Sequence, residues 1–299
     1  MASTGGAQHG GDPEDEGERI VLWPEERLAC VLGVIRSARE RLILSLFRCS
    51  EPQVLEELAE ALARGVRVEV LLTPRAKRWK QRLQELWERL EGMGAQVLRY
   101  ADPVVKYHAK YIVADDGPAL VGSLNFTGKC FLRTCDFVQI SRDPGVVAGL
   151  KRIFELDCGR SETGLPLDLS ERLIVGPERA RAQLAALLGG AERSIRIIDT
   201  KVTDTEMVEL LRARKRAGIE VEVLARRKLG VLRSHGKLLL VDGRVAVIGS
   251  IALSALGLES RRELALVVSA PRCVEQLTAF YATLAADSRL EPASPGASI

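Results

Sequence analysis

The chain has 299 residues, of which 46% are hydrophobic and 4% aromatic, with a formal net charge of +3. This length favours two domains or one large domain. The weak net charge neither favours nor excludes nucleic acid, the few aromatic residues count against a broad base-stacking surface, and the lack of any run of about 18 apolar residues excludes a membrane-spanning segment.

The two ends of the chain and its cysteines indicate where disorder is expected and in which compartment the protein lies. The acidic start lacks the apolar core of a signal peptide, and we expect disordered tails over 1–18 and 289–299. The six cysteines include no CxxC pair and no spacing typical of a zinc site. We therefore expect reduced thiols and a cytoplasmic protein.

After the acidic start, strand and helix patterns alternate. We predict a strand over 41–47, a helix over 51–65 that ends at Gly65, and a strand over 66–73. Leu83, Leu86 and Leu90 follow at helical spacing, which predicts a helix over about 77–92, with a strand near 95–100. Further along, 194–199, 203–218 and 219–225 predict a second strand, helix and strand.

These two series are copies of one unit. Three separated matches share one offset of 153 residues, for example Pro24 with Pro177 and Gly65 with Gly218. Repetition at a fixed offset indicates an internal duplication, and alternating strands and helices indicate an α/β sandwich. We predict a first half over 19–158, a linker over 159–172 and a second half over 173–288.

The scarce histidines mark the candidate site. His108 and His235 each precede a lysine by two residues on a stretch that predicts a strand. Because side chains alternate along a strand, His108 and Lys110 face one side, as do His235 and Lys237. An imidazole beside an ammonium group suits an anion that must also exchange protons.

Each motif continues into a predicted hairpin. Asp115 and Asp242 open its turn, and their opposite parity favours turn formation over direct contact with a phosphate. The return strands end at Ser123 and Ser250, each preceded by a glycine and level with the histidine and lysine. Glycine permits close backbone approach, and serine offers a hydroxyl and an N–H to an oxyanion.

An acid follows each histidine at a matched distance. Asp136 and Glu263 lie 28 residues after the histidine of their own copy (136 − 108 and 263 − 235). A carboxylate at this distance could orient an imidazole through its ring N–H, as the acid of a catalytic triad does.

HxKxxxxD followed by GSxN, present twice, resembles the phospholipase D superfamily, also called the HKD family, and within it the two-motif single-chain enzymes and the cardiolipin synthases. The resemblance covers about 20–285. The second copy departs from the pattern at Ala252, where the first copy has Asn125, so the site is expected to be asymmetric. The matching residues are His108, Lys110, Asp115, Gly122, Ser123 and Asn125 in the first copy and His235, Lys237, Asp242, Gly249 and Ser250 in the second.

The resemblance implies a duplicated phospholipase D-like α/β sandwich, with two halves related by a pseudo-twofold axis and both motifs at one site. It implies cleavage of a phosphodiester through a covalent phosphohistidine, with His108 as the nucleophile by family habit and His235 as the general acid and base. The residues alone leave that order open. The implied catalytic set is His108, Lys110, Asp115, His235, Lys237 and Asp242, with phosphate contacts from Ser123, Asn125 and Ser250, orienting acids Asp136 and Glu263, and no metal or cofactor, because two lysines fill the electrostatic role.

The expected substrate is a phosphodiester, with a phospholipid favoured, and the expected enzyme is a monomer that hydrolyses or transfers a phosphatidyl group. Basic segments 74–82 and 225–237 are either solvated faces or an electropositive funnel for a polyanion or an anionic membrane surface. An inactive phosphate-binding relative is one alternative. The other is a metal-independent nuclease of the same superfamily, in which phosphates would be contacted without sequence readout by Arg75, Lys77, Arg78, Lys80 and Arg82.

Overall fold

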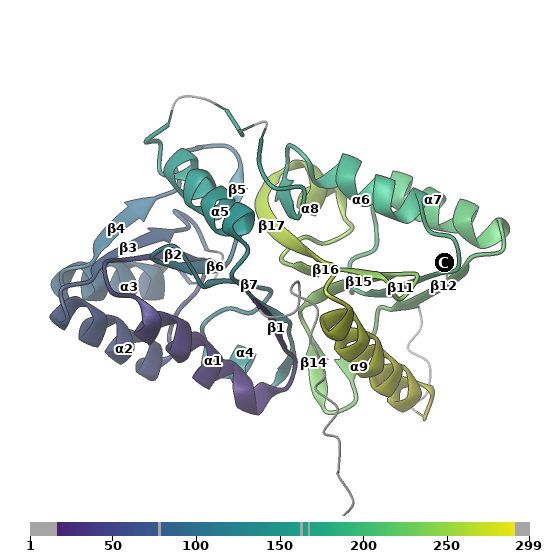
Figure 1. Cartoon of the computed structure of the whole chain (residues 1–299), viewed down its shortest axis with the longest axis horizontal. Helices are drawn as coiled ribbons and strands as arrows, with labels where there is room; N and C mark the ends of the chain where they lie inside the picture. The colour runs from purple at the N-terminus through teal and green to yellow at the C-terminus, as the bar shows by residue number, and fades with distance from the viewer. Residues whose placement is uncertain (1–16, 77–78, 162–163, 167, 291–299) are drawn as a thin grey trace, which may run out of the picture.

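The structure is a computed structural model that describes residues 17–76, 79–161, 164–166 and 168–290. Two mixed β-sheets lie side by side, one from each half of the chain, with helices on their faces (Figure 1). Most of both predicted tails falls outside the described residues. Where the structure does describe them, Glu18 opens the first strand and the last helix continues to Leu290, so regular structure reaches into both predicted tails.

The first sheet combines antiparallel hairpin strands with parallel strands that alternate with helices. Helices α1, α2 and α3 cover one face, and α5 covers the other. Its strand order is β1 (Glu18–Val21), β9 (Val138–Ser141), β7 (Ala119–Gly122), β6 (Tyr111–Ala114), β2 (Arg41–Leu46), β3 (Arg67–Leu72) and β4 (Gln96–Arg99), and its helices are α1 (Pro24–Ser37), α2 (Pro52–Ala63), α3 (Lys80–Gly92), α4 (Gly128–Leu132) and α5 (Pro144–Asp157).

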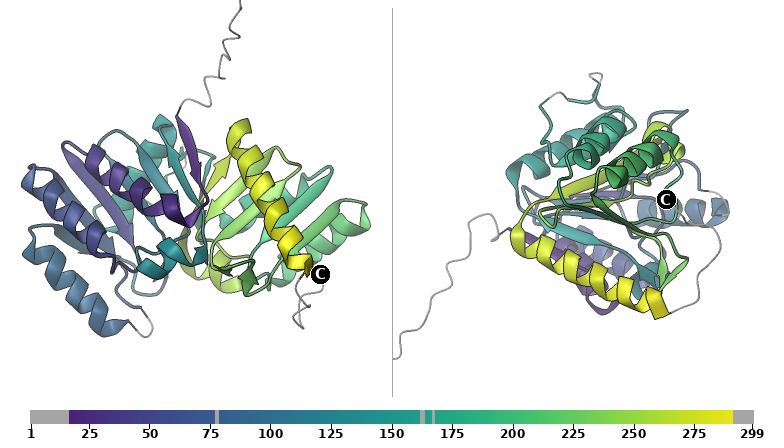
Figure 2. Two further views of the ribbon diagram at one scale, coloured as in Figure 1. Left: turned by 90° about the horizontal axis from the view of Figure 1, so that it is seen from below. Right: turned by 90° about the vertical axis from the view of Figure 1, so that its right-hand side faces the viewer.

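The second sheet repeats this arrangement. Helices α6 and α7 cover one face and α9 the other, as the right-hand view of Figure 2 shows. Its strand order is β10 (Leu173–Gly176), β17 (Arg261–Val268), β16 (Val245–Gly249), β15 (Lys237–Val241), β11 (Ser194–Ile198) and β12 (Glu220–Leu224), and its helices are α6 (Ala180–Gly189), α7 (Thr205–Arg216), α8 (Ala255–Glu259) and α9 (Pro271–Leu290).

The predicted duplicated sandwich is confirmed, and so is the helix and strand inserted in the first half, which are α3 and β4. One helix from each half also packs across the boundary. Helix α5 contacts the first sheet together with Leu173 and Leu264 of the second half. Helix α9 contacts the second sheet together with Ile20 and Phe137 of the first half. These matched contacts relate the halves by a pseudo-twofold axis.

Two short strands are exchanged between the halves. Strand β5 (Lys106–Tyr107) pairs in parallel with β17, and β14 (Leu232–Ser234) pairs in parallel with β8 (Thr134–Cys135). A further strand, β13 (Lys228–Leu229), forms a hairpin with β14. Each exchanged strand ends one residue before a histidine of the motif, so the fold carries each imidazole toward the other half.

A buried arginine supports one of these exchanged contacts. Arg27 is 0% exposed, and its guanidinium donates hydrogen bonds to the carbonyl oxygens of Leu22, Cys130, Thr134 and Asp136. The buried guanidinium therefore holds β8, the strand that pairs with β14, against the start of the chain.

We predict that Arg27→Met lowers the free energy of unfolding by about 3 kcal/mol or more, because four buried carbonyls lose their donor. Urea denaturation measures this loss. Exposed Arg216→Met, the matched control, should change it by less than about 0.5 kcal/mol, and an equally small effect of Arg27→Met would contradict the assignment.

Candidate active site

The first histidine lies at the contact between the halves. His108 follows β5 directly, and its backbone N–H donates to the carbonyl of Arg262 on β17 at 2.9 Å. Its side-chain Nδ1 lies 2.8 Å from Oε2 of Glu263, which is 1% exposed. The imidazole of the first half is therefore held by a carboxylate of the second half.

The second histidine repeats this arrangement in the opposite direction. His235 follows β14, and its Nδ1 lies 2.7 Å from Oδ1 of Asp136, which is fully buried in the first half. The next residue, Gly236, donates its N–H to Cys135, and a methyl group at Gly236 would lie 2.7 Å from the Ser123 hydroxyl. Only glycine permits this close approach of the two halves.

The pairing of acids and histidines is thus exchanged. The spacing in the sequence relates each acid to the histidine of its own copy, whereas the structure joins it to the histidine of the other copy. With a carboxylate accepting at Nδ1, each ring is fixed in orientation and its Nε2 is left for chemistry.

The two lysines lie beside their histidines, as the motif predicts. Lys110 Nζ donates to the His108 carbonyl at 2.7 Å, and Lys237 Nζ donates to the His235 carbonyl at 2.6 Å. Their surroundings differ, because Lys237 also lies 3.6 Å from a carboxylate oxygen of Asp199. Among the described residues, no carboxylate forms an ion pair with Lys110.

A continuous series of contacts joins the two motifs. The carbonyl of Lys110 accepts the Gly122 N–H at 3.2 Å, and the next residue, Ser123, donates its hydroxyl to Asp136 at 2.6 Å. Asp136 in turn holds His235. The pKa of Lys110 is lowered to about 8, chiefly by burial and also by the charge of Lys237, while Glu263 and Asp136 oppose the shift. Both acids and the other lysine therefore influence the pKa of Lys110, as expected if the two motifs form a single site.

Burial favours a neutral His108. Burial lowers the pKa of its imidazole, Lys110 and Arg261 lower it too, and Glu263 opposes the shift without reversing it. The pKa of Glu263 lies below its ordinary value, because the contacts with His108, Lys110 and Ser250 outweigh its burial. The ring is therefore an unprotonated base beside an ionised acid at neutral pH.

Asp136 is held more extensively than Glu263. It accepts hydrogen bonds from the hydroxyls of Ser123 and Thr134 in addition to its contact with His235. Burial would raise the pKa of Asp136, but these partners together keep it below the ordinary value. Thr134 precedes Asp136 by two residues, so strand parity in the sequence could have predicted it on the same face.

The hydroxyls of the two serines, for which phosphate contacts are predicted, have protein partners in the structure. The Ser123 hydroxyl is directed to Asp136 and its N–H to the Phe137 carbonyl. Ser250 uses its hydroxyl and its N–H for the backbone of Leu264, next to Glu263. Both serines therefore fix the strands that carry the orienting acids.

Asn125 differs from the serines. It is 7% exposed, and its Oδ1 has no hydrogen-bond partner among the described residues. Its counterpart Ala252 is also buried and offers no polar atom. The predicted asymmetry is therefore present in the structure, with an amide on the first-half side alone.

Asp115 and Asp242 lie away from the imidazoles, at the hairpin turns, with positive φ angles of 47° and 57°. Asp115 accepts the backbone N–H groups of Arg39, Glu40 and Arg41. Asp242 accepts those of residues 192–194 in the same way. These contacts fasten each hairpin to the start of the neighbouring strand, which is the turn-forming role that strand parity favours.

Several residues near the histidines were not predicted. The Phe47 ring meets His108 edge-on at 4.7 Å between centroids, and Lys110 Nζ lies 5.4 Å from the same ring. An offset of 153 relates Phe47 to Thr200, so the duplication gives no signal for it. Cys130, Asp136 and His235 place one ligand atom each within 4.8 Å, a set that could hold a metal ion.

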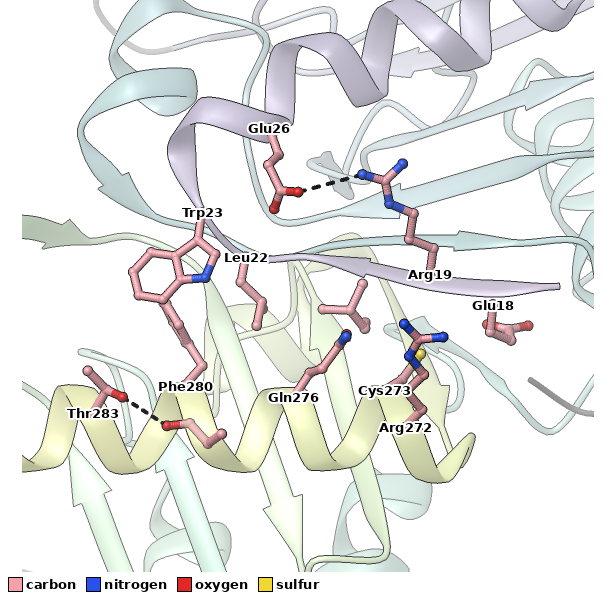
Figure 3. A pocket seen from close by; sticks show the side chains of 12 residues that line it. Glu18, Arg19, Leu22, Trp23, Glu26, Arg272, Cys273, Gln276, Phe280 and Thr283 are labelled. Carbon is pink, nitrogen blue, oxygen red and sulfur yellow. Dashed lines mark hydrogen bonds and ion pairs between the residues drawn. The ribbon is translucent and has the colours of Figure 1, made fainter. Parts of the chain in front are cut away.

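A cavity of about 580 Å³ lies elsewhere, between β1 and α9. Figure 3 shows Trp23 edge-on to Phe280 and the ion pair of Arg19 with Glu26 along its walls. None of the predicted site residues lines it. The candidate chemistry is therefore at the boundary between the two motifs and not in this cavity.

In the described part of the chain, no helix is both long enough and apolar enough to cross a bilayer. Residues 31–158 match the family model described as "Cardiolipin synthase, PLD-like domain". A comparison with curated proteins found no match.

Solved structures share the fold over most of the chain. Polyphosphate kinase from Porphyromonas gingivalis is 17% identical with a TM-score of 0.73, and the match covers 89% of this chain and 46% of that protein. Phosphatidylserine synthase from Haemophilus influenzae Rd KW20 is 12% identical with a TM-score of 0.69, and the match covers 92% and 86%. This chain therefore spans less than half of the kinase. At these identities the likeness concerns the fold.

Proposed function

We propose that this chain, whose residues 31–158 form a phospholipase D-like domain, cleaves phosphodiesters through a covalent phosphohistidine. The observation that carries the proposal is the exchanged pair of imidazole–carboxylate contacts, His108 with Glu263 and His235 with Asp136. Two oriented imidazoles provide a nucleophile and a proton donor, which are the two groups that such a displacement needs.

In the first step, Nε2 of neutral His108 attacks phosphorus and forms a P–N bond while the P–O bond to the leaving alkoxide breaks. His235 gives its proton to that alkoxide. In the second step, His235 takes a proton from water or an alcohol, whose oxygen attacks phosphorus and releases His108. The lowered pKa of His108 supports its role as the nucleophile.

Lys110, Lys237 and the Asn125 amide bind the non-bridging oxygens. Fixed cations stabilise the charge that develops on these oxygens in the transition state. The free Oδ1 of Asn125 accepts no protein donor among the described residues, so this amide is available to reorient toward a substrate. No metal ion takes part in the proposed steps.

A phosphatidyl group is the substrate that we propose. The matching family model is described by cardiolipin synthase, and phosphatidylserine synthase shares the fold over 92% of this chain. The test is a parallel assay of phosphatidylcholine, phosphatidylglycerol and single-stranded DNA at two salt concentrations. Turnover of lipid without cleavage of DNA is expected. DNA cleavage without lipid turnover would replace the lipid substrate with nucleic acid.

The proposal predicts where activity falls at low pH. Protonated His108 cannot attack phosphorus, and its pKa lies below the ordinary value of about 6.5. The acid limb of kcat/KM should therefore lie below pH ~6.5. Arg261→Gln removes a cation that lowers this pKa and should move the limb upward, whereas Arg216→Gln should leave it in place. An acid limb above that value in the unmodified enzyme would contradict a neutral His108.

A further inference from the structure

We propose that the chain docks onto anionic bilayers through a rim of four exposed aliphatic side chains that flank the pseudo-twofold axis. The rim comprises Val104, Leu132, Val231 and Leu256, which are 82%, 64%, 95% and 54% exposed. This inference rests on the proposed phospholipid substrate, since it explains how the enzyme would reach a lipid in a membrane.

The duplication relates the two sides of the rim. Val104 and Val231 are separated by 127 residues, the offset that also separates His108 from His235, and each lies four residues before its histidine. Four residues of extended chain span about 13 Å. Each exposed valine is thus tethered close to a catalytic imidazole.

The other two members of the rim lie on equivalent short helices but at different positions, since the offset of 127 relates Leu132 to Glu259 and Leu256 to Lys129. Leu132 ends α4, which leads into β8, and Leu256 belongs to α8, which leads into β17. The connections match: the Arg233 N–H donates to Arg133 at 2.9 Å, and the Lys106 N–H donates to Ser260 at 3.3 Å. Figure 1 shows α4 beside the β14 hairpin at one edge of the boundary and α8 beside β17 at the opposite edge.

This symmetry makes the rim suitable for a flat partner. A twofold rotation keeps equivalent atoms at the same height along its axis, so the two valines lie at the same height on opposite sides of that axis. A bilayer is flat on this scale and accepts aliphatic side chains between its headgroups. Isolated exposed aliphatics need no explanation, but Val104 and Val231 are exposed at matched positions in the two halves.

Cations next to the rim favour a membrane with an anionic surface as the partner. Lys228 and Arg233 are exposed and directly opposite each other in the β13–β14 hairpin, a like-charge pairing that is unfavourable without an anion. Exposed Arg133, Lys129 and Arg227 lie on the adjoining segments. Two carboxylates border this cluster, Asp287 against Gly230 and Glu51 against Gly128, and the cations of the cluster outnumber them. On the other side of the rim, Asp102 lies beside Val104 and Glu259 on the helix of Leu256, so the excess of cations is on the Val231 side.

The same features favour a membrane over nucleic acid. Single-stranded nucleic acid is bound by cations together with aromatic rings on which bases stack. The rim offers aliphatic side chains in that place. Membrane binding is strengthened by each basic residue near an anionic leaflet and by each inserted aliphatic group. The rim and its neighbouring cations supply both kinds of group.

Co-sedimentation with phosphatidylcholine vesicles containing about 30% phosphatidylglycerol tests the inference. The double variant Val104→Ser/Val231→Ser should bind at least about tenfold more weakly, because both apolar anchors are lost. Val104→Ile/Val231→Ile keeps them and should bind as the unmodified protein does. Undiminished vesicle binding by the serine variant would contradict docking through the rim.

Charge reversal separates the membrane from nucleic acid. Arg133→Glu/Lys228→Glu should weaken vesicle binding, whereas Arg142→Glu/Arg216→Glu, with the same change in charge, should not. Loss of single-stranded DNA binding with unchanged vesicle binding would assign this surface to nucleic acid. Hydrolysis of bis(p-nitrophenyl) phosphate is measured in parallel: the rim variants should retain it, and its absence from the unmodified protein would defeat the proposed chemistry without bearing on vesicle binding.

Discussion

His108→Ala and His235→Ala should each lower kcat for bis(p-nitrophenyl) phosphate by more than about 10⁴-fold, because residues that act as one catalytic unit each cost nearly the whole rate when removed. The two variants should differ in their first turnover. p-Nitrophenolate leaves without a proton donor, so His235→Ala should release one equivalent rapidly and then stop. His108→Ala should give no burst.

Rapid-mixing absorbance measurements distinguish these outcomes. Lys151→Ala is the control and should leave both phases intact, because Lys151 pairs with exposed Asp116 and with neither orienting acid. Most of the activity surviving in either histidine variant would remove the paired mechanism. A burst in His108→Ala and none in His235→Ala would exchange the two roles.

Glu263→Gln and Asp136→Asn should each lower kcat by about 10²–10⁴-fold, because an amide can hold its imidazole in the wrong tautomer. The exchanged contacts predict which step each variant affects. Glu263→Gln should resemble loss of His108 and suppress the burst, although Glu263 lies in the second half. Asp136→Asn should resemble loss of His235 and retain the burst.

The same absorbance traces decide between exchanged and unexchanged pairing. If each acid served the histidine of its own copy, Asp136→Asn would suppress the burst and Glu263→Gln would retain it. Glu178→Gln is a suitable control, because Glu178 pairs with Arg262 next to the site but touches neither imidazole. Its first turnover and its steady-state rate should both stay within about threefold of the unmodified enzyme.

Most of the fold follows from the sequence because the duplication repeats long periodic elements. Matches such as Gly65 with Gly218 locate equivalent helix ends, and the leucines from Leu83 to Leu90 predict the inserted helix α3. The predicted linker, 159–172, falls between the end of α5 at Asp157 and the start of β10 at Leu173. Residues 162, 163 and 167 of that linker lie outside the described part of the chain.

The exchange between halves could not be predicted in the same way. Strands β5 and β14 have two and three residues, too few to leave an alternating pattern, and their partners belong to the other half. Spacing along the chain therefore identifies Asp136 and Glu263 as a matched pair of acids but says nothing of which histidine each one holds. Only the packing of the halves settles this.

The hydrogen-bond partners of single polar groups could not be predicted from the sequence. The two serines match the motif, yet strand pairing and the neighbouring acid occupy their donors. Phe47 and Asp199 lie where the copies differ, at positions related to Thr200 and Leu46, so repetition could not reveal them. They make the two lysine environments unequal, with an aromatic ring near Lys110 and a carboxylate near Lys237.

The central claim is that the two motif imidazoles, delivered by strands exchanged between the halves, act together on one phosphoryl group. Mass spectrometry of peptides from His235→Ala, quenched with alkali after mixing with bis(p-nitrophenyl) phosphate, tests it most directly. The account predicts a single p-nitrophenylphosphoryl adduct on His108, and none in His235→Ala/Glu263→Gln quenched at the same early time. The absence of any adduct on His108, despite release of p-nitrophenolate, would contradict it.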